Sequence, residues 1–308
     1  MAFNPHRLAA KKHALKLRSA MLRSVREFFY DRDYVEVETP HRIPAPIPEA
    51  HISPEVSGNW FLHTSPEICM KQMLAAGYDR IFQICRCFRR AERGARHLPE
   101  FTLLEWYAAG ADYRFPMQEC EALFGYVARH LGKGLVLHHQ QATIDLTPPW
   151  PCRTVTESFE RFSPISLTQA MAEDRFDEMM GLHIEPKLGL DKPEFLIDYP
   201  ASFGALARLK PGAPEVAERF ELYVAGMEIC NGFSELNDPA EQRRRFDAEQ
   251  RTWQQLGRPI YPTPERFLDA LSTMPDAAGN ALGIDRMVML FADTPDIERV
   301  TTFTPEDL

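Results

Sequence analysis

Two strand-like segments separated by a short polar stretch constrain the fold most strongly. Residues 81–89 and 100–108 are rich in apolar and β-favouring side chains, and the segment between them is polar and arginine-rich. A connection of that length joins antiparallel strands, because parallel strands need a longer crossover that usually contains a helix. We therefore expect a hairpin within a largely antiparallel sheet, in a mixed α+β fold.

Periodic patterns elsewhere add helices and further strands. Helices are expected over residues 7–31, 66–76, 115–131, 239–257 and 284–292, and strands over 34–38, 219–231 and 279–283. Another helix is expected after Thr154, which together with Glu157 matches a capping box. No repeat or linker-like tract interrupts the chain, so we expect a single domain over residues 1–308.

Composition narrows the class of protein. The chain has 308 residues, of which 44% are hydrophobic and 26% charged, as in globular domains. No apolar run approaches the length of a membrane span, and a net charge of −9 disfavours a broad nucleic-acid surface. The six cysteines lack zinc-site spacing; Cys85 and Cys87 fit one face of a strand better than a metal site. We expect all six to be buried thiols of a cytoplasmic protein.

The predicted hairpin carries the richest set of functional side chains. Side chains alternate between the two faces of a strand. One face of the first strand therefore carries Gln83, Cys85, Cys87 and Arg89, and one face of the second carries Phe101, Leu103, Glu105 and Tyr107. Glu105 stands among apolar neighbours and calls for a cationic partner. The loop carries Arg90, Arg93, Arg96 and His97, a composition suited to anions. A solvated loop on an ordinary hairpin is the alternative.

Two further clusters lie near the carboxyl end. Glu228, Asn231, Glu235 and Asn237 bracket a glycine, interpreted as a turn at the end of a strand. Such oxygens can hold Mg²⁺ between protein and phosphates, although helix-capping groups are an equal alternative. In residues 279–286, a glycine-bearing strand enters a helix that carries Arg286 near its N-terminus. This junction predicts an anion site, or else an arginine paired with a nearby acid.

The three clusters together resemble motifs 2 and 3 of class II aminoacyl-tRNA synthetases, and the first helix, strand and Pro40 resemble motif 1. The chain has no P-loop and no G-x-G-x-x-G, so a nucleotide must bind by another route. The runs R-H-L-P-E-F-T-L-L-E-W-Y, E-I-C-N-G-F-S-E-L-N-D and A-L-G-I-D-R-M-V-M closely resemble those of lysyl-tRNA synthetases. The resemblance extends from about Arg7 to Leu290.

A stand-alone family of lysyl-tRNA synthetase paralogues is more similar still. The runs His63–Glu67 and Asp198–Ser202, with Lys71, resemble that family, and motif 1 begins almost at Met1, so we expect no anticodon-binding domain. The resemblance implies a ligase that activates (R)-β-lysine or lysine with ATP and Mg²⁺. It also implies transfer to a lysine of elongation factor P, a homodimer, and no use of tRNA.

The resemblance assigns roles residue by residue. Those on the amino-acid side are Ser65 and Glu67 for the amino group, Glu105 and Tyr107 for the ε-ammonium, Asn231 and Asn237 near the amino acid, and Ala281, where an alanine is associated with β-lysine preference. Those on the ATP side are Arg89 on the α-phosphate, His97 and Arg286 on the γ-phosphate, Phe101 on adenine, Glu228 and Glu235 on Mg²⁺ and ATP, and Gly283 in motif 3.

The chain departs from the family pattern at three positions, and two other functions stay open. Ala91 replaces the usual glutamate of motif 2, so that Glu92 takes its place or the contact is lost; Leu98 replaces an asparagine; and Phe203 stands where a polar residue is expected. The alternatives are a truncated lysyl-tRNA synthetase that still charges tRNA and a catalytically silent paralogue that only binds.

Overall fold

The computed structural model of the chain describes residues 5–49 and 52–308. The principal strands are β1 (Val35–Glu36), β5 (Arg80–Phe88), β6 (Glu100–Ala109), β9 (Cys152–Thr154), β10 (Glu194–Pro200), β11 (Leu209–Lys210), β12 (Ala213–Val224), β13 (Met227–Ser234) and β14 (Ala277–Gly283). Smaller sheets contain β2 (Arg42–Ile43), β3 (Glu55–Ser57), β4 (Trp60–Leu62), β7 (Val136–His139) and β8 (Ala142–Asp145).

The helices surround this main sheet. They are α1 (Pro5–Ala10), α2 (Lys12–Tyr30), α3 (Glu67–Ala75), α4 (Arg114–His130), α5 (Val155–Phe162), α6 (Leu167–Ala172), α7 (Phe176–Met179), α8 (Pro239–Gln255), α9 (Glu265–Leu271) and α10 (Ile284–Phe291). Short 3₁₀ or π turns are η1 (Met180–Ile184), η2 (Glu185–Lys187), η3 (Ala201–Phe203), η4 (Ile297–Arg299) and η5 (Pro305–Asp307). Among the described residues, no helix is both long and apolar enough to span a membrane.

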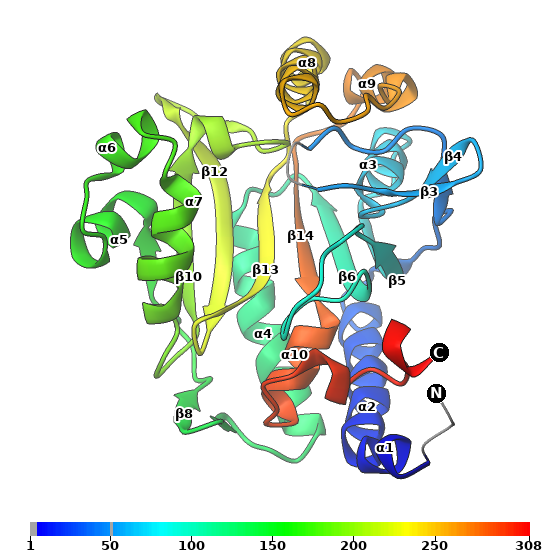
Figure 1. Cartoon of the computed structure of the whole chain (residues 1–308), viewed down its shortest axis with the longest axis vertical. Helices are drawn as coiled ribbons and strands as arrows, with labels where there is room; N and C mark the ends of the chain where they lie inside the picture. The colour runs from blue at the N-terminus through cyan, green and yellow to red at the C-terminus, as the bar shows by residue number, and fades with distance from the viewer. Residues whose placement is uncertain (1–4, 50–51) are drawn as a thin grey trace.

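The main sheet confirms the expected α+β fold with mostly antiparallel strands. Its nine strands run in the order β1-β5-β6-β14-β13-β12-β10-β9, with β11 paired to β12. Only the pairs β1–β5 and β9–β10 are parallel. Helices α2, α4 and α10 pack together against one face (Figure 1), where Phe29, Trp106, Phe124 and Met287 are buried. These helices leave the opposite face of the sheet available for a functional site.

The predicted hairpin of residues 81–108 is present, whereas the sequence did not predict a second hairpin, β12–β13. Strands β5 and β6 match the predicted 81–89 and 100–108 closely. The single strand predicted over 219–231 is wrong, because the chain turns at Ala225 and Gly226, both with positive φ, between β12 and β13. The apolar pattern continues through this turn, and Ala225 is not a typical turn residue. The sequence pattern therefore did not indicate that the strand ends here.

Other boundaries and the cysteines also need correction. The helix expected over 7–31 is divided at Lys11 into α1 and α2, and the strand expected over 34–38 is reduced to β1. All six cysteines are free thiols, but Cys152 is exposed and Cys69 is half-buried. Because both thiols reach the surface, the prediction that every cysteine is buried is wrong for these two.

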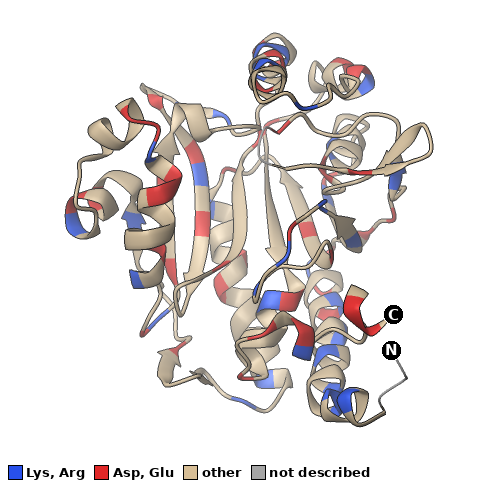
Figure 2. Ribbon diagram, viewed as in Figure 1, with Lys and Arg blue, Asp and Glu red and all other residues tan. Residues whose placement is uncertain are grey.

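The C-terminal end is held against the first helices by opposite charges. Figure 2 shows acidic residues of this end beside the basic residues of α1 and α2. Asp307 accepts from Arg7 Nη1 at 2.9 Å and from Lys11 Nζ at 3.2 Å. The Lys11 side chain is only 7% exposed, so this pair is better shielded from solvent than an ordinary surface ion pair.

Helix α5 begins with the predicted capping box. Thr154 Oγ1 accepts from Glu157 N at 3.1 Å, and Glu157 Oε2 accepts from Thr154 N at 2.8 Å. We expect Thr154→Ala to lower the free energy of unfolding by about 1 kcal/mol, because an orphan amide of the first turn loses its acceptor. Urea unfolding measures this loss. Thr156→Ala, on the exposed surface of the same turn, is the control, and equal losses in both variants would contradict the capping role.

Candidate active site

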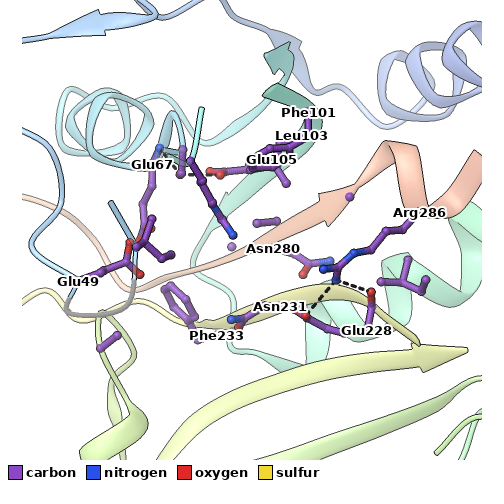
Figure 3. A pocket seen from close by; sticks show the side chains of 18 of the residues that line it. Glu49, Glu67, Phe101, Leu103, Glu105, Glu228, Asn231, Phe233, Asn280 and Arg286 are labelled. Atoms are coloured by element: carbon purple, nitrogen blue, oxygen red, sulfur yellow. Dashed lines mark hydrogen bonds and ion pairs between the residues drawn. The ribbon is translucent and has the colours of Figure 1, made fainter. Parts of the chain in front are cut away.

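A single face of the sheet brings the three predicted clusters together. Strand register aligns one row of residues across five strands: Gln83, Glu105, Ala281, Asn231 and Glu221. Residues opposite each other in neighbouring strands project from the same face. A cavity of about 280 Å³ lies over this face and is lined by the β5–β6 hairpin, β13 and the β14–α10 junction (Figure 3).

One side of the cavity holds a carboxylate without a cation. Glu105 is 1% exposed; it accepts from Ser65 Oγ at 2.6 Å and from Tyr107 Oη at 2.9 Å. Burial, followed by the nearby charge of Glu67, raises the pKa of Glu105 well above its usual value. Glu105 forms no ion pair with any residue that the structure describes. The expected cationic partner must therefore come from outside the described chain, and a bound ammonium fits that requirement.

A buried lysine completes this side of the cavity. Lys71 Nζ contacts Glu67 Oε1 at 2.6 Å and makes an even closer contact with Glu235 Oε2. Burial lowers the pKa of Lys71, but the charges of Glu235 and Glu67 outweigh it and the net shift is upward. Gly279 stands opposite Tyr107, and a Cβ at Gly279 would lie 2.3 Å from the tyrosine ring. Only glycine leaves this side of the cavity open.

The other side of the cavity is rich in arginine. Arg286 Nη1 donates to Glu228 Oε2 at 3.0 Å, and Arg286 Nη2 lies 2.7 Å from His97 Nε2. Burial and the charge of Arg286 lower the pKa of His97, which favours a neutral imidazole that accepts this hydrogen bond. Arg89 lies over the Phe101 ring at 5.0 Å, and its Nε is buried without a hydrogen-bond partner among the described residues.

Irregular pairing in the β12–β13 hairpin places Glu228 in the cavity. Strict alternation from Asn231 would turn Glu228 to the opposite face, since the two residues are three positions apart. The register moves from Leu222↔Cys230 to Tyr223↔Glu228, so β13 carries one extra residue and the bulge restores Glu228 to the cavity face. Sequence alternation gives no signal for such a bulge.

The two glutamates expected to share Mg²⁺ lie at opposite ends of β13. Glu228 is the second residue of this strand and Glu235 directly follows its last residue, with Gly232 inside the strand and not in a turn. Seven residues of strand separate the two backbone positions by roughly 23 Å, and Glu235 contacts Lys71. Both side chains line the cavity, so their joint binding of one Mg²⁺ stays a prediction.

Glu221 stands in the same row across the sheet but does not line the cavity. Arg219 Nη2 donates to Glu221 Oε1 and Tyr223 Oη donates to Glu221 Oε2, each at 2.6 Å. Burial, and then the charges of Glu221 and Glu228, raise the pKa of Glu185 to about 7. Mg²⁺ binds to one or two carboxylates and completes its shell with phosphates and water, so Glu228, which lines the cavity, fits this role.

Not every predicted site residue lines the cavity. Those that do are Ser65, Glu67, Arg89, His97, Phe101, Glu105, Tyr107, Glu228, Asn231, Glu235, Ala281, Gly283 and Arg286. Asn231 Oδ1 is buried without a hydrogen-bond partner among the described residues, as expected of a group awaiting a ligand. Asn237 is not among the lining residues: its Nδ2 donates to Asp276 Oδ1 at 3.1 Å on the loop before α8.

The three departures from the family pattern lie in different surroundings. Ala91 has a positive φ in the β5–β6 loop, whereas Glu92 lines the cavity and lies 3.9 Å from Arg89 Nη1. Leu98 is buried and gives the cavity an apolar wall. Phe203 stacks on Phe176 at 4.0 Å and does not line the cavity.

Comparison with known proteins now identifies the class. The model of the class II tRNA synthetases (D, K and N) matches residues 5–307, and the chain belongs to this family, whose members use ATP. It is 38% identical to an elongation factor P–(R)-beta-lysine ligase of Vibrio cholerae over 94% of each chain. A ligase of the same name from Vibrio atlanticus is 36% identical over 96% of each chain. A lysine–tRNA ligase of Moorella thermoacetica is 35% identical over 95% of this chain and 65% of the relative.

Proposed function

We propose that the chain activates (R)-β-lysine, or lysine, with ATP as an aminoacyl-adenylate and transfers it to a lysine of elongation factor P. The observation that carries this proposal is a buried carboxylate without a cation, Glu105, in the same cavity as the arginine pair Arg89 and Arg286. A substrate with an ammonium group at one end and a carboxylate at the other matches both sides. The names of the ligase relatives support the same substrate and acceptor.

In the first half-reaction, a carboxylate oxygen of the substrate attacks the α-phosphorus of ATP. A C–O–P mixed anhydride forms, the bond from the α-phosphorus to the bridging oxygen breaks, and pyrophosphate leaves with the electron pair. The substrate carboxylate is already ionised, so no general base is required. The protein contributes positioning, which can supply about 7–11 kcal/mol, and positive charge from Arg89 and Arg286 near the transferring group.

Glu228 is the residue proposed to hold Mg²⁺ beside the phosphates, with Glu235, which lines the same cavity, as the second predicted ligand. When bound, the ion neutralises phosphate charge. Arg286 Nη1 contacts Glu228 Oε2 at 3.0 Å and therefore also orients this carboxylate. On the other side, Arg286 Nη2 lies 2.7 Å from His97 Nε2, and this contact keeps the guanidinium directed along the cavity.

In the second half-reaction, the neutral ε-amine of the acceptor lysine attacks the carbonyl carbon of the anhydride. An amide bond forms, AMP leaves, and the amine gives up a proton. The direct test combines the chain, ATP, Mg²⁺, (R)-β-lysine and elongation factor P, with the intact mass of elongation factor P as readout. A mass gain of one β-lysyl group supports the proposal, whereas an unmodified acceptor together with charged lysine tRNA would replace it with tRNA charging.

Homodimer formation and a cytoplasmic location belong to the same proposal. Motif 1 corresponds to α2 and β1, and α2 buries one face with Val25 and Phe29 against its own sheet. Its outer side is left for a two-fold partner of the kind that class II enzymes use. Light scattering of the purified chain distinguishes a dimer from a monomer.

Substrate binding should release a proton from Glu105. Its pKa is raised well above the usual value in the free protein, and an ammonium partner lowers it again. Affinity for the diamino acid should therefore increase as pH rises toward the free-protein pKa, and then level off. Calorimetry in buffers of different ionisation enthalpy measures the released proton. Glu105→Gln should abolish the release, and a release that persists in this variant would assign it to another group.

A further inference from the structure

A cluster of two thiols and an imidazole lies beside the cavity and has no part in the proposed reaction. The residues are His63, Cys85 and Cys87, and their potential metal-binding atoms all lie within 4.8 Å of one another. Among the residues the structure describes, no other set of three such side chains meets this spacing. All three residues are buried, with exposures of 1%, 7% and 0% in that order. Buried thiols and imidazole are ligands that thiophilic metal ions prefer.

The third ligand comes from outside the hairpin, which explains why cysteine spacing predicts no metal site. His63 follows β4, and its backbone is fixed at two points: His63 N donates to His41 O at 2.8 Å, and Phe88 N donates to His63 O at 3.0 Å. These bonds hold His63 against the end of β5, where Cys85 and Cys87 share a face. The site is therefore assembled by the fold and not by a local motif.

The spacing of the donor atoms is close to that of a tetrahedral zinc site. Cys85 Sγ and Cys87 Sγ are 3.8 Å apart, and two sulfurs at the usual zinc–sulfur distance of about 2.3 Å in tetrahedral geometry are also about 3.8 Å apart. Cys87 Sγ lies 4.0 Å from His63 Nε2, whereas tetrahedral zinc needs about 3.6 Å. A small rotation of the histidine side chain covers this difference.

The imidazole presents Nε2 to the thiols. His63 Nε2 also lies 2.7 Å from Arg86 O, whereas His63 Nδ1 is buried without a hydrogen-bond partner among the described residues. Metal binding through Nε2 therefore replaces its contact with Arg86 O, and the other ring nitrogen, Nδ1, carries the proton of the neutral imidazole.

We propose that His63, Cys85 and Cys87 bind a thiophilic d¹⁰ metal ion, with Zn²⁺ as the probe. The three ligands leave a fourth position for water or a small ligand. The ion ties the segment after β4 to β5. It lies next to the cavity wall, because Cys87 pairs with Phe101 and Cys85 pairs with Leu103 across the hairpin. Its binding therefore fixes the strand that leads to Arg89.

Metal binding by the wild-type protein is the first test. The reduced, metal-stripped chain is titrated with Zn²⁺ against a chromogenic chelator, and with Co²⁺ to record thiolate-to-cobalt charge-transfer absorption. We expect one tightly bound ion per chain and a clear charge-transfer band. Zn²⁺ should also protect Cys85 and Cys87 from alkylation, mapped by mass spectrometry, while exposed Cys152 still reacts. Absence of the band and of protection would overturn the proposal.

Matched cysteine variants locate the ion. Cys120 and Cys230 form another buried thiol pair, 3.7 Å apart. Within the described part of the chain, this pair belongs to no group of three potential metal ligands. Cys87→Ser should weaken Zn²⁺ binding by at least about 100-fold, whereas Cys230→Ser should leave it unchanged. Circular dichroism confirms that both variants are folded. Equal affinity in Cys87→Ser and wild type, or equal loss in Cys230→Ser, would contradict the assignment.

Discussion

Arg89→Ala should reduce ATP–pyrophosphate exchange by about 10²- to 10³-fold, the range found when one preorganised donor to a developing charge is removed. Arg89 directly follows β5 and lines the cavity, with its Nε buried and without a partner among the described residues. Its guanidinium lies 5.0 Å from the centre of the Phe101 ring, which holds it in place before ATP binds. The variant removes this charge and leaves the strand intact.

Arg86→Ala is the matched control for this prediction. Arg86 lies on the same strand but on the opposite face, 41% exposed, with only a 3.7 Å contact to Glu100. Exchange by Arg86→Ala should be close to that of wild type, because exposed ion pairs contribute little. Near wild-type exchange by Arg89→Ala, or a comparable loss in both variants, would remove Arg89 from the proposed chemistry.

Glu105→Gln should weaken binding of the diamino acid by about 2–5 kcal/mol, which is at least about thirty-fold in KM, with a much smaller change for ATP. The amide can still accept from Ser65 or Tyr107, so the variant keeps much of the local packing while losing the charge. An ammonium group bound at a neutral amide in a buried site lacks its counter-charge. Steady-state kinetics with each substrate varied separately measures the split.

Glu119→Gln controls for the loss of any buried carboxylate. Glu119 is 7% exposed; it accepts from Tyr34 Oη at 2.9 Å and from Trp106 Nε1 at 2.8 Å, outside the cavity. We expect lower thermal stability for Glu119→Gln but an unchanged KM for the diamino acid. If Glu105→Gln raised the KM for ATP as much as that for the diamino acid, the ammonium pocket would lie elsewhere.

Features that depend on neighbouring residues in the sequence could be predicted, whereas features that depend on contacts between distant segments could not. The hairpin β5–β6 follows from alternation, and the start of α8 follows from Asp238, whose side chain accepts from Ala240 N and Glu241 N. Alternation also places Glu105 and Tyr107 together on one face. Local spacing and residue chemistry are sufficient in these places because the deciding interactions lie within a few residues.

The remaining parts of the site depend on contacts between distant segments. The position of Glu228 depends on a bulge in β13, and Glu235 contacts Lys71, which is remote in sequence. Asn237 is drawn away from the cavity by Asp276, which is remote in sequence. Neither a bulge nor a long-range ion pair leaves a periodic trace in the sequence.

The most direct measurement is ATP–pyrophosphate exchange by the purified chain with Mg²⁺, in parallel reactions with (R)-β-lysine, (S)-β-lysine, α-lysine or no amino acid. An Ala281→Gly variant belongs in the same series, because Ala281 stands between Glu105 and Asn231 in the row across the sheet. We expect exchange to be driven best by (R)-β-lysine in the wild type. No exchange with any diamino acid, despite measurable ATP binding, would contradict an adenylating enzyme and favour a protein that only binds.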